Sequence, residues 1–200
     1  MLSVYLDIET VSDPYLPTDA LQIKADRKGE PLCKFIATSP WCCRIVCVGM
    51  IACDQHGNEE SFALTGDEEE IVKRSRDVLA RATRIITFAG KGFDVPALAF
   101  AMARHGVKVP EIIKQAKAQK PWETLPHWDL CEEACWNGKT RRPSLQEACI
   151  GLLGEDPKAK CTGDAVQHLW EQGRISDIAD YCLSDVRYTK LLAAKLQWVG

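Results

Sequence analysis

The sequence has no surplus of basic residues, because its 25 Lys and Arg stand against 28 Asp and Glu, for a net charge of −3. A nucleic-acid-binding role would therefore have to come from local basic patches or from bridging cations. The sequence also lacks an apolar run of membrane length, internal repeats, low-complexity tracts and interdomain linkers. It opens on strand-like residues (residues 1–5) instead of a targeting segment. These absences predict one domain over residues 1–200, with no membrane contact.

Cysteine pairs with the C-x-x-C spacing are missing too, although the chain contains ten cysteines and Cys42, Cys43 and Cys47 form a looser cluster. A zinc site usually uses tight pairs such as C-x-x-C, whereas Cys131 and Cys135 are four residues apart. Other cysteines, such as Cys47 and Cys182, lie in apolar runs or on expected helix faces, as small hydrophobic residues do. The pattern favours buried free thiols and a reducing cytoplasmic location.

Apolar runs and turn residues predict an α/β domain with one mixed sheet and helices packed on it. Strands are expected over 3–8, 44–53, 59–64 and 84–88, and helices over 68–82, 93–106, 109–119, 144–153 and 175–198. Residues 11–41 carry four prolines and mixed charges, and we expect them to form a long inserted loop.

The last expected helix contains an acid where an apolar residue would be typical. Spaced at 100° per residue, its apolar stripe comprises Ile178, Cys182, Val186, Thr189, Ala193 and Leu196. Asp185 falls within this stripe, and Tyr181 lies one turn earlier on the same edge. A carboxylate that faces a core needs a partner, and no Lys or Arg of this helix shares its face. A metal ion shared with other acids is the natural candidate.

Three further acids have the positions expected of metal ligands. Asp7 and Glu9 are two residues apart on a strand that should be central, so their side chains project from the same face near its C-terminal end. Asp94 follows a glycine-containing turn at the start of a helix. Each signal has a simpler reading when taken alone: a solvent-facing strand end for Asp7 and Glu9, and an N-cap for Asp94. Tyr181 and Asp185 could likewise be a core tyrosine and an ion-paired aspartate.

Taken together and in order, these motifs resemble the DEDD superfamily of 3′-5′ exonucleases, in its tyrosine-bearing DEDDy branch. The matching stretches are Leu6-Asp7-Ile8-Glu9-Thr10, residues 88–96 with Phe93-Asp94-Val95-Pro96, and Tyr181-Cys182-Leu183-Ser184-Asp185. Within that superfamily the chain is most similar to stand-alone proteins related to the proofreading domain of family B DNA polymerases. Residues 144–147 and 160–164 also resemble that group.

The resemblance implies a ribonuclease-H-like fold with a central mixed five-stranded sheet flanked by helices. It implies hydrolysis of phosphodiester bonds from a 3′ end with two divalent cations, and oxygen ligands favour Mg²⁺ or Mn²⁺. Asp7, Glu9 and Asp185 would hold one ion. Asp94 would support the second, to which Asp7 bridges. Tyr181 would orient the attacking water, because a phenol is a poor base at neutral pH.

The sequence leaves the roles of Ala89 and Asp129 undecided. The second motif of the family often has Asn where this chain has Ala89. That Asn is not a metal ligand, so its replacement affects the anchoring of the loop or a substrate contact more than metal binding. Asp129 could be a fifth acid of the site, but its place before Glu132 favours a helix cap.

The expected substrate is a single-stranded DNA or RNA 3′ end, cleaved to nucleoside monophosphates. Trp41 or Trp122 could stack on bases, although a core or interface role is favoured. Basic residues that could contact phosphates are Lys139, Arg141, Arg142, Lys158 and Lys160. The main alternative is a non-catalytic binding module on the same fold, and a third is a repair or replication subunit docked on a protein partner. The sequence does not choose between DNA and RNA, and it does not define an oligomeric state.

Overall fold

The computed structural model describes residues 1–13, 15–16, 18–120, 122–136, 138–157 and 163–197. Within these ranges the strands form one five-stranded sheet in the order β3-β2-β1-β4-β5. Their bounds are β1 Leu2–Ser12, β2 Cys43–Asp54, β3 Glu59–Thr65, β4 Arg84–Thr87 and β5 His127–Asp129. β1 is antiparallel to β2 and parallel to β4, so the sheet is mixed, as the sequence predicted.

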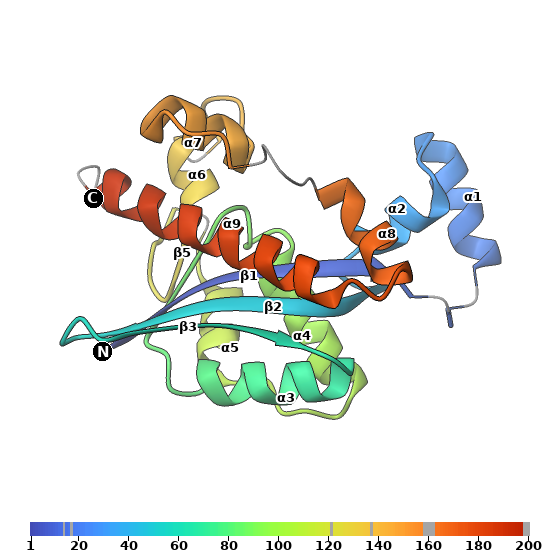
Figure 1. Cartoon of the computed structure of the whole chain (residues 1–200), viewed down its shortest axis with the longest axis horizontal. Helices are drawn as coiled ribbons and strands as arrows, with labels where there is room; N and C mark the ends of the chain where they lie inside the picture. Colours follow the sequence, from blue (N-terminus) through green and yellow to red (C-terminus); the bar gives the residue numbers. More distant parts are fainter. Residues whose placement is uncertain (14, 17, 121, 137, 158–162, 198–200) are drawn as a thin grey trace.

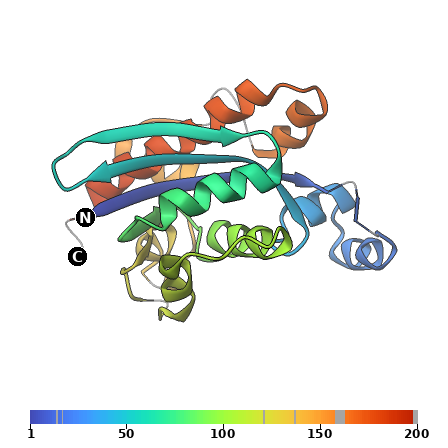
Figure 2. The same ribbon diagram turned by 90° about the horizontal axis from the view of Figure 1, so that it is seen from below.

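Helices cover both faces of the sheet (Figures 1 and 2). One face carries α9 (Ile175–Leu196), and the other carries α3 (Glu68–Leu79) and α4 (Asp94–Arg104). The remaining helices are α1 (Asp19–Lys28), α2 (Leu32–Ala37), α5 (Glu111–Ala118), α6 (Leu130–Ala134), α7 (Leu145–Leu153) and α8 (Val166–Glu171). A short 3-10 turn, η1 (Gly163–Ala165), precedes α8. Both views place α1, α2 and α8 together at the end of the sheet where β1 finishes.

The alternation of β1 explains how these layers form. Val4, Leu6 and Ile8 are buried in the core cluster that includes residues of α3 and α4. The intervening residues point to the opposite face: Tyr5 packs near the C-terminal part of α9, and Val11 packs near its N-terminal part. Asp7 and Glu9 belong to this second set and therefore project toward α9.

The segment 11–41, expected as a loop, contains regular structure. β1 continues to Ser12, and α1 and α2 follow. Among the described residues of these two helices, only Ala25 and Ile36 are buried. Neither helix therefore has the broad apolar stripe from which a helix is recognised in sequence.

An ionic cluster around the buried carboxylate of Glu68 joins α3, α4 and β2. The Glu68 carboxylate accepts hydrogen bonds from the backbone N–H of Ile45 at 2.7 Å and from the Arg104 guanidinium at 3.1 Å. The His105 ring lies 2.7 Å from its second oxygen, and Arg104 also donates to the Cys43 carbonyl. This cluster fixes α4, the helix that begins with Asp94, against the sheet.

Among the described residues, none of the helices is both long enough and apolar enough to cross a bilayer.

Candidate active site

The first two acids lie on the central strand, where it faces α9. Glu9 is 9% exposed, and Asp7 is partly buried. The pairing of β1 with β2 shifts register between Glu9 and Thr10, so the strand is irregular immediately after the second acid. Such irregularities re-aim side chains and are frequent beside active sites.

The last helix approaches the sheet closely at the level of Asp7. Asp7 pairs with Gly49 of β2, and a Cβ atom on Gly49 would lie 2.9 Å from the Cys182 sulfur. Glycine is thus required at this position for α9 to pack against β2. The Cys182 thiol donates weak hydrogen bonds to the Asp7 carbonyl at 3.5 Å and to the Asp7 carboxylate at 3.6 Å.

The helical wheel predicted the orientation of α9 correctly. Ile178, Cys182, Val186, Thr189, Ala193 and Leu196 are all buried. Asp185 is 6% exposed and Tyr181 is 7% exposed, so both lie on the packed face, while Asp180 and Arg187 are exposed. The carboxylate of Asp185 is therefore held toward the sheet and its acids, as inferred from the stripe.

Asp94 is the first residue of α4 and is 6% exposed. Phe93, and not Asp94, occupies the N-cap position, so the N-cap alternative does not describe Asp94. Gly90 packs against it: a Cβ atom there would lie 2.5 Å from the Thr87 hydroxyl oxygen and 2.6 Å from a carboxylate oxygen of Asp94. The glycine of the loop therefore leaves the space that the Asp94 carboxylate occupies.

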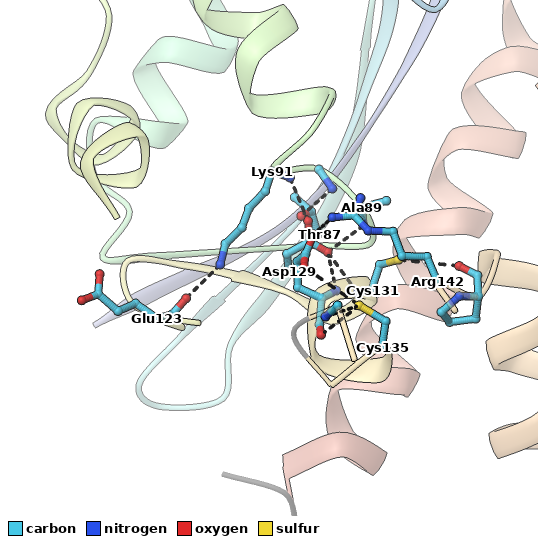
Figure 3. A network of polar contacts seen from close by, with 12 residues as sticks. Thr87, Ala89, Lys91, Glu123, Asp129, Cys131, Cys135 and Arg142 are labelled. Carbon is cyan, nitrogen blue, oxygen red and sulfur yellow. Dashed lines mark hydrogen bonds and ion pairs between the residues drawn. The ribbon is translucent and has the colours of Figure 1, made fainter. Parts of the chain in front are cut away.

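Asp129 anchors the loop between β4 and α4 (Figure 3). Its carboxylate accepts hydrogen bonds from the backbone N–H groups of Ala89 and Lys91, both at 2.9 Å. It also caps α6 by accepting from the N–H groups of Cys131 at 3.0 Å and Glu132 at 3.4 Å. The capping interpretation of Asp129 is confirmed, and the same carboxylate holds the loop that leads to Asp94.

The acids act strongly on one another. Burial raises the pKa of Glu9 well above its usual range, and the charges of Asp7, Asp185 and Asp94 raise it further. Burial likewise raises the pKa of Asp94, with added contributions from Asp7 and Asp129. The groups that act most on Glu9 are three carboxylates and the Cys47 thiol, and all of them raise its pKa. A divalent cation would offset this repulsion.

A ligand-sized cluster is present within this group. One carboxylate oxygen each from Asp7 and Glu9 and the sulfur of Cys182 lie within 4.8 Å of one another. In the sequence Cys182 belongs to the apolar stripe and has no visible link to the acids, because only the tertiary packing of α9 on β1 brings its sulfur beside them. Two of the three donors are carboxylate oxygens, so the cluster is chemically suited to hold a divalent cation.

Other candidate substrate-binding residues have diverse surroundings. Trp41 is 69% exposed and stacks on Phe100, and Trp122 is 62% exposed, so both remain accessible to a base. Arg141 pairs with Glu147 at 2.8 Å, and Arg142 pairs with Glu132. Lys139 is exposed, whereas Lys158 and Lys160 lie outside the described residues.

Residues 34–199 match the family described as predicted 3′-5′ exonucleases related to the exonuclease domain of PolB. The match begins after Asp7 and Glu9, so the structure is what places these two acids beside Asp185. The comparison with curated proteins gave no match.

A family B DNA polymerase and an exonuclease are among the solved structures with a similar fold. The family B DNA polymerase of Pyrobaculum calidifontis is 19% identical, with a TM-score of 0.63 over 98% of this chain and 24% of the polymerase. Escherichia coli exonuclease I in complex with a dT13 oligonucleotide is 13% identical, with a TM-score of 0.54 over 99% of this chain and 42% of the exonuclease. This chain thus spans less than half of either protein, and the likeness identifies a ribonuclease-H-like exonuclease fold. The chain belongs to the family of predicted 3′-5′ exonucleases related to the exonuclease domain of PolB.

Proposed function

We propose that this protein is a metal-dependent 3′-5′ exonuclease that releases nucleoside monophosphates from single-stranded nucleic acid ends. The observation that carries the proposal is the convergence of the partly buried Asp7 with the buried Glu9, Asp94 and Asp185, from three distant segments, each raising the pKa of a neighbour. Packing alone gives no reason to bury several carboxylates together, because each ionised group is destabilised by the others.

Asp7, Glu9 and Asp185 would hold one divalent cation, and Asp7 and Asp94 would support a second. When bound, such a pair neutralises the acids, activates water and stabilises the attacking and leaving oxygens of a phosphodiester. The protein contributes rigidity: the Cys182 thiol contacts the Asp7 carboxylate, and Asp129 holds the loop before Asp94. The first contact limits the rotation of a proposed ligand, and the second fixes the backbone that leads to another.

Tyr181 would position the attacking water. Burial raises the pKa of the Tyr181 phenol, and the charges of Asp185, Glu9 and Asp7 raise it further. The hydroxyl therefore remains protonated throughout the neutral range and can donate a hydrogen bond, but it cannot serve as a general base.

A single strand is the proposed substrate. The structure of E. coli exonuclease I holds a dT13 oligonucleotide, and this chain shares its fold.

The described cysteines, nine in number, are all free thiols, which suits a reducing compartment such as the cytoplasm. We also propose that the chain acts in repair or replication, alone or beside a protein partner.

Two substitutions on α9 test the activity. Asp185→Asn changes a buried proposed ligand, and Asp180→Asn makes the same charge change on the exposed side of the same helix. With a 5′-labelled oligonucleotide in Mg²⁺ or Mn²⁺, we expect a ladder of products shortened from the 3′ end by the wild type and by Asp180→Asn. Asp185→Asn should lose at least about 100-fold in rate, because removal of a ligand disrupts the metal site itself.

Parallel assays with DNA and RNA strands would identify the preferred sugar. Equal rates for Asp185→Asn and the wild type would remove Asp185 from the site. If all three proteins bind the strand but none shortens it, the chain is a binding module on an exonuclease fold.

A further inference from the structure

A cavity of about 510 Å³ lies beside the buried acids. The end of β1 lines it through Ile8, Glu9 and Thr10, and Phe93 contributes an aromatic ring next to Asp94. Gly163 also lines it, and a Cβ atom on Gly163 would lie 3.7 Å from the Tyr181 hydroxyl. The cavity therefore adjoins three elements that carry proposed catalytic residues, and its size is that of a pocket for a small ligand such as one nucleotide.

The opposite wall of this cavity is formed by α2 and the residues flanking it. Cys33, Lys34, Ala37 and Thr38 line the cavity, together with Pro31 at the N-cap of the helix. This helix belongs to the 11–41 segment, for which the sequence offered no function.

Helix α2 is fastened directly to the catalytic strand. Thr10 follows Glu9 on β1, and its hydroxyl donates a hydrogen bond to the Ala37 carbonyl of α2 at 2.8 Å. Ile36 of α2 is 1% exposed, so its buried side chain also holds the helix against the rest of the fold. The wall is therefore part of the folded domain, at a fixed distance from the acids.

Lys34 gives this wall its charge. It is exposed, and it is the one cationic side chain among the described residues that line the cavity. The cavity otherwise combines Phe93, the hydroxyl oxygens of Thr10 and Thr38, and the amide of Gln167. Both hydroxyls donate to backbone carbonyls and the amide is hydrogen-bonded to Ser12 and Glu171, so the oxygens of these groups remain as acceptors for a sugar hydroxyl. An aromatic surface for a base, polar groups for a sugar and a cation for a phosphate are together the chemistry of a nucleotide in a single strand.

We infer that α2 is the substrate-facing wall of the pocket and that Lys34 contacts a backbone phosphate of the bound strand. The inference rests on the proposed exonuclease function and adds an element and a residue to it. The size of the cavity beside Glu9 suits one unpaired nucleotide of that strand. Lys34 therefore determines affinity for the strand, without a part in the chemical step.

The matched variants are Lys34→Gln and Lys117→Gln. Both remove one positive charge from an exposed helical position, but Lys117 lies on α5 and does not line the cavity. Binding of a 5′-fluorescent oligo-dT is measured by anisotropy, with Ca²⁺ in place of Mg²⁺, between 50 and 200 mM salt. Lys34→Gln should bind roughly 3- to 10-fold more weakly at low salt, and the slope of log K against log salt should fall by about 0.7.

In cleavage assays Lys34→Gln should raise KM in the same proportion with kcat unchanged, and Lys34→Arg should restore binding. Lys117→Gln should match the wild type in every measurement. An unchanged affinity and salt slope for Lys34→Gln, in a wild type that cleaves, would overturn the role of α2 and leave the exonuclease proposal intact. A wild type that neither binds nor cleaves the strand would overturn both.

Discussion

Ala89 adopts a left-handed backbone conformation, with φ of 66°. Such a conformation is unfavourable for a residue with a Cβ atom, by about 1–2 kcal/mol, and Gly or Asn accepts it more readily. In the exonucleases that this sequence resembles, the position is often Asn, which suits that conformation. In this chain the two N–H bonds to Asp129 hold the loop in shape despite the alanine.

Replacement of Ala89 by glycine should therefore stabilise the protein. The variant relieves the strain, while the added freedom of glycine in the unfolded chain offsets part of the gain. We expect the free energy of unfolding to rise by about 0.5–1 kcal/mol, measured by urea denaturation. Ala103→Gly, at an exposed helical position on α4, is the control and should lower it by a similar amount. A loss of stability in Ala89→Gly would show that the left-handed conformation carries no strain.

The edge strand β5 has only three residues and is held by side chains as well as by β4. The Gln119 side chain accepts from the His127 N–H at 3.0 Å and donates to the His127 carbonyl at 2.7 Å. The His127 ring lies 2.8 Å from the Thr87 hydroxyl of β4, which also accepts from the Gly90 N–H. These contacts connect β5 to the loop before Asp94, so loosening β5 would release part of the site.

The His127 imidazole makes this connection sensitive to acid. Burial lowers its pKa from 6.5 to about 4, so the folded protein binds fewer protons than the unfolded chain between these two pH values. Its contribution to stability is therefore complete above about pH 6.5 and is lost as the pH falls toward 4, by up to roughly 3 kcal/mol. In urea titrations at pH 4.5 and 7.5, the fall in stability on acidification should be smaller for His127→Gln than for the wild type.

The pKa values of Glu9 and Asp94 are raised by folding, so these acids increase the stability as the pH falls, opposite to His127. The relevant measurement is therefore the difference in pH dependence between His127→Gln and the wild type. His56→Gln, an exposed position in the β2–β3 turn, should leave the pH dependence unchanged. Parallel pH dependences for His127→Gln and the wild type would show that the ring is not buried as a neutral group.

Across the fold, the parts that the sequence predicts are those with a strong local pattern. The stripe of α9 and the alternation of β1 placed Asp185, Asp7 and Glu9 on packed surfaces, and the capping box of α7 formed as expected at Ser144. The helices of the 11–41 segment were missed because they bury so few residues. β5 was missed because three residues are too short for a periodic signal. The proximity of Cys182 to Asp7 depends on how α9 lies on β1, which no local pattern contains.

Convergence of the acids should make the stability of the entire domain depend on divalent cations. At about 100 times its dissociation constant, a ligand that binds only the folded state stabilises it by about 2.7 kcal/mol. For a chain of this size, that corresponds to a rise of roughly 5–10 °C in the thermal midpoint. We expect Mn²⁺ to produce this rise at pH 8 and EDTA to reverse it.

Glu9→Gln should raise the thermal midpoint in EDTA and abolish the further rise with Mn²⁺. The pKa of Glu9 is raised by burial and by its acidic neighbours, so its ionised form destabilises the metal-free protein at pH 8, and the neutral amide should raise the midpoint in EDTA. The same substitution removes a proposed ligand and should abolish the rise with Mn²⁺. Asp180→Asn should retain the wild-type midpoints in both conditions. A Glu9→Gln protein that still gains the full stabilisation from Mn²⁺ would mean that the cation binds elsewhere, because a carboxylate serving only the packing of β1 would leave the response to Mn²⁺ unchanged.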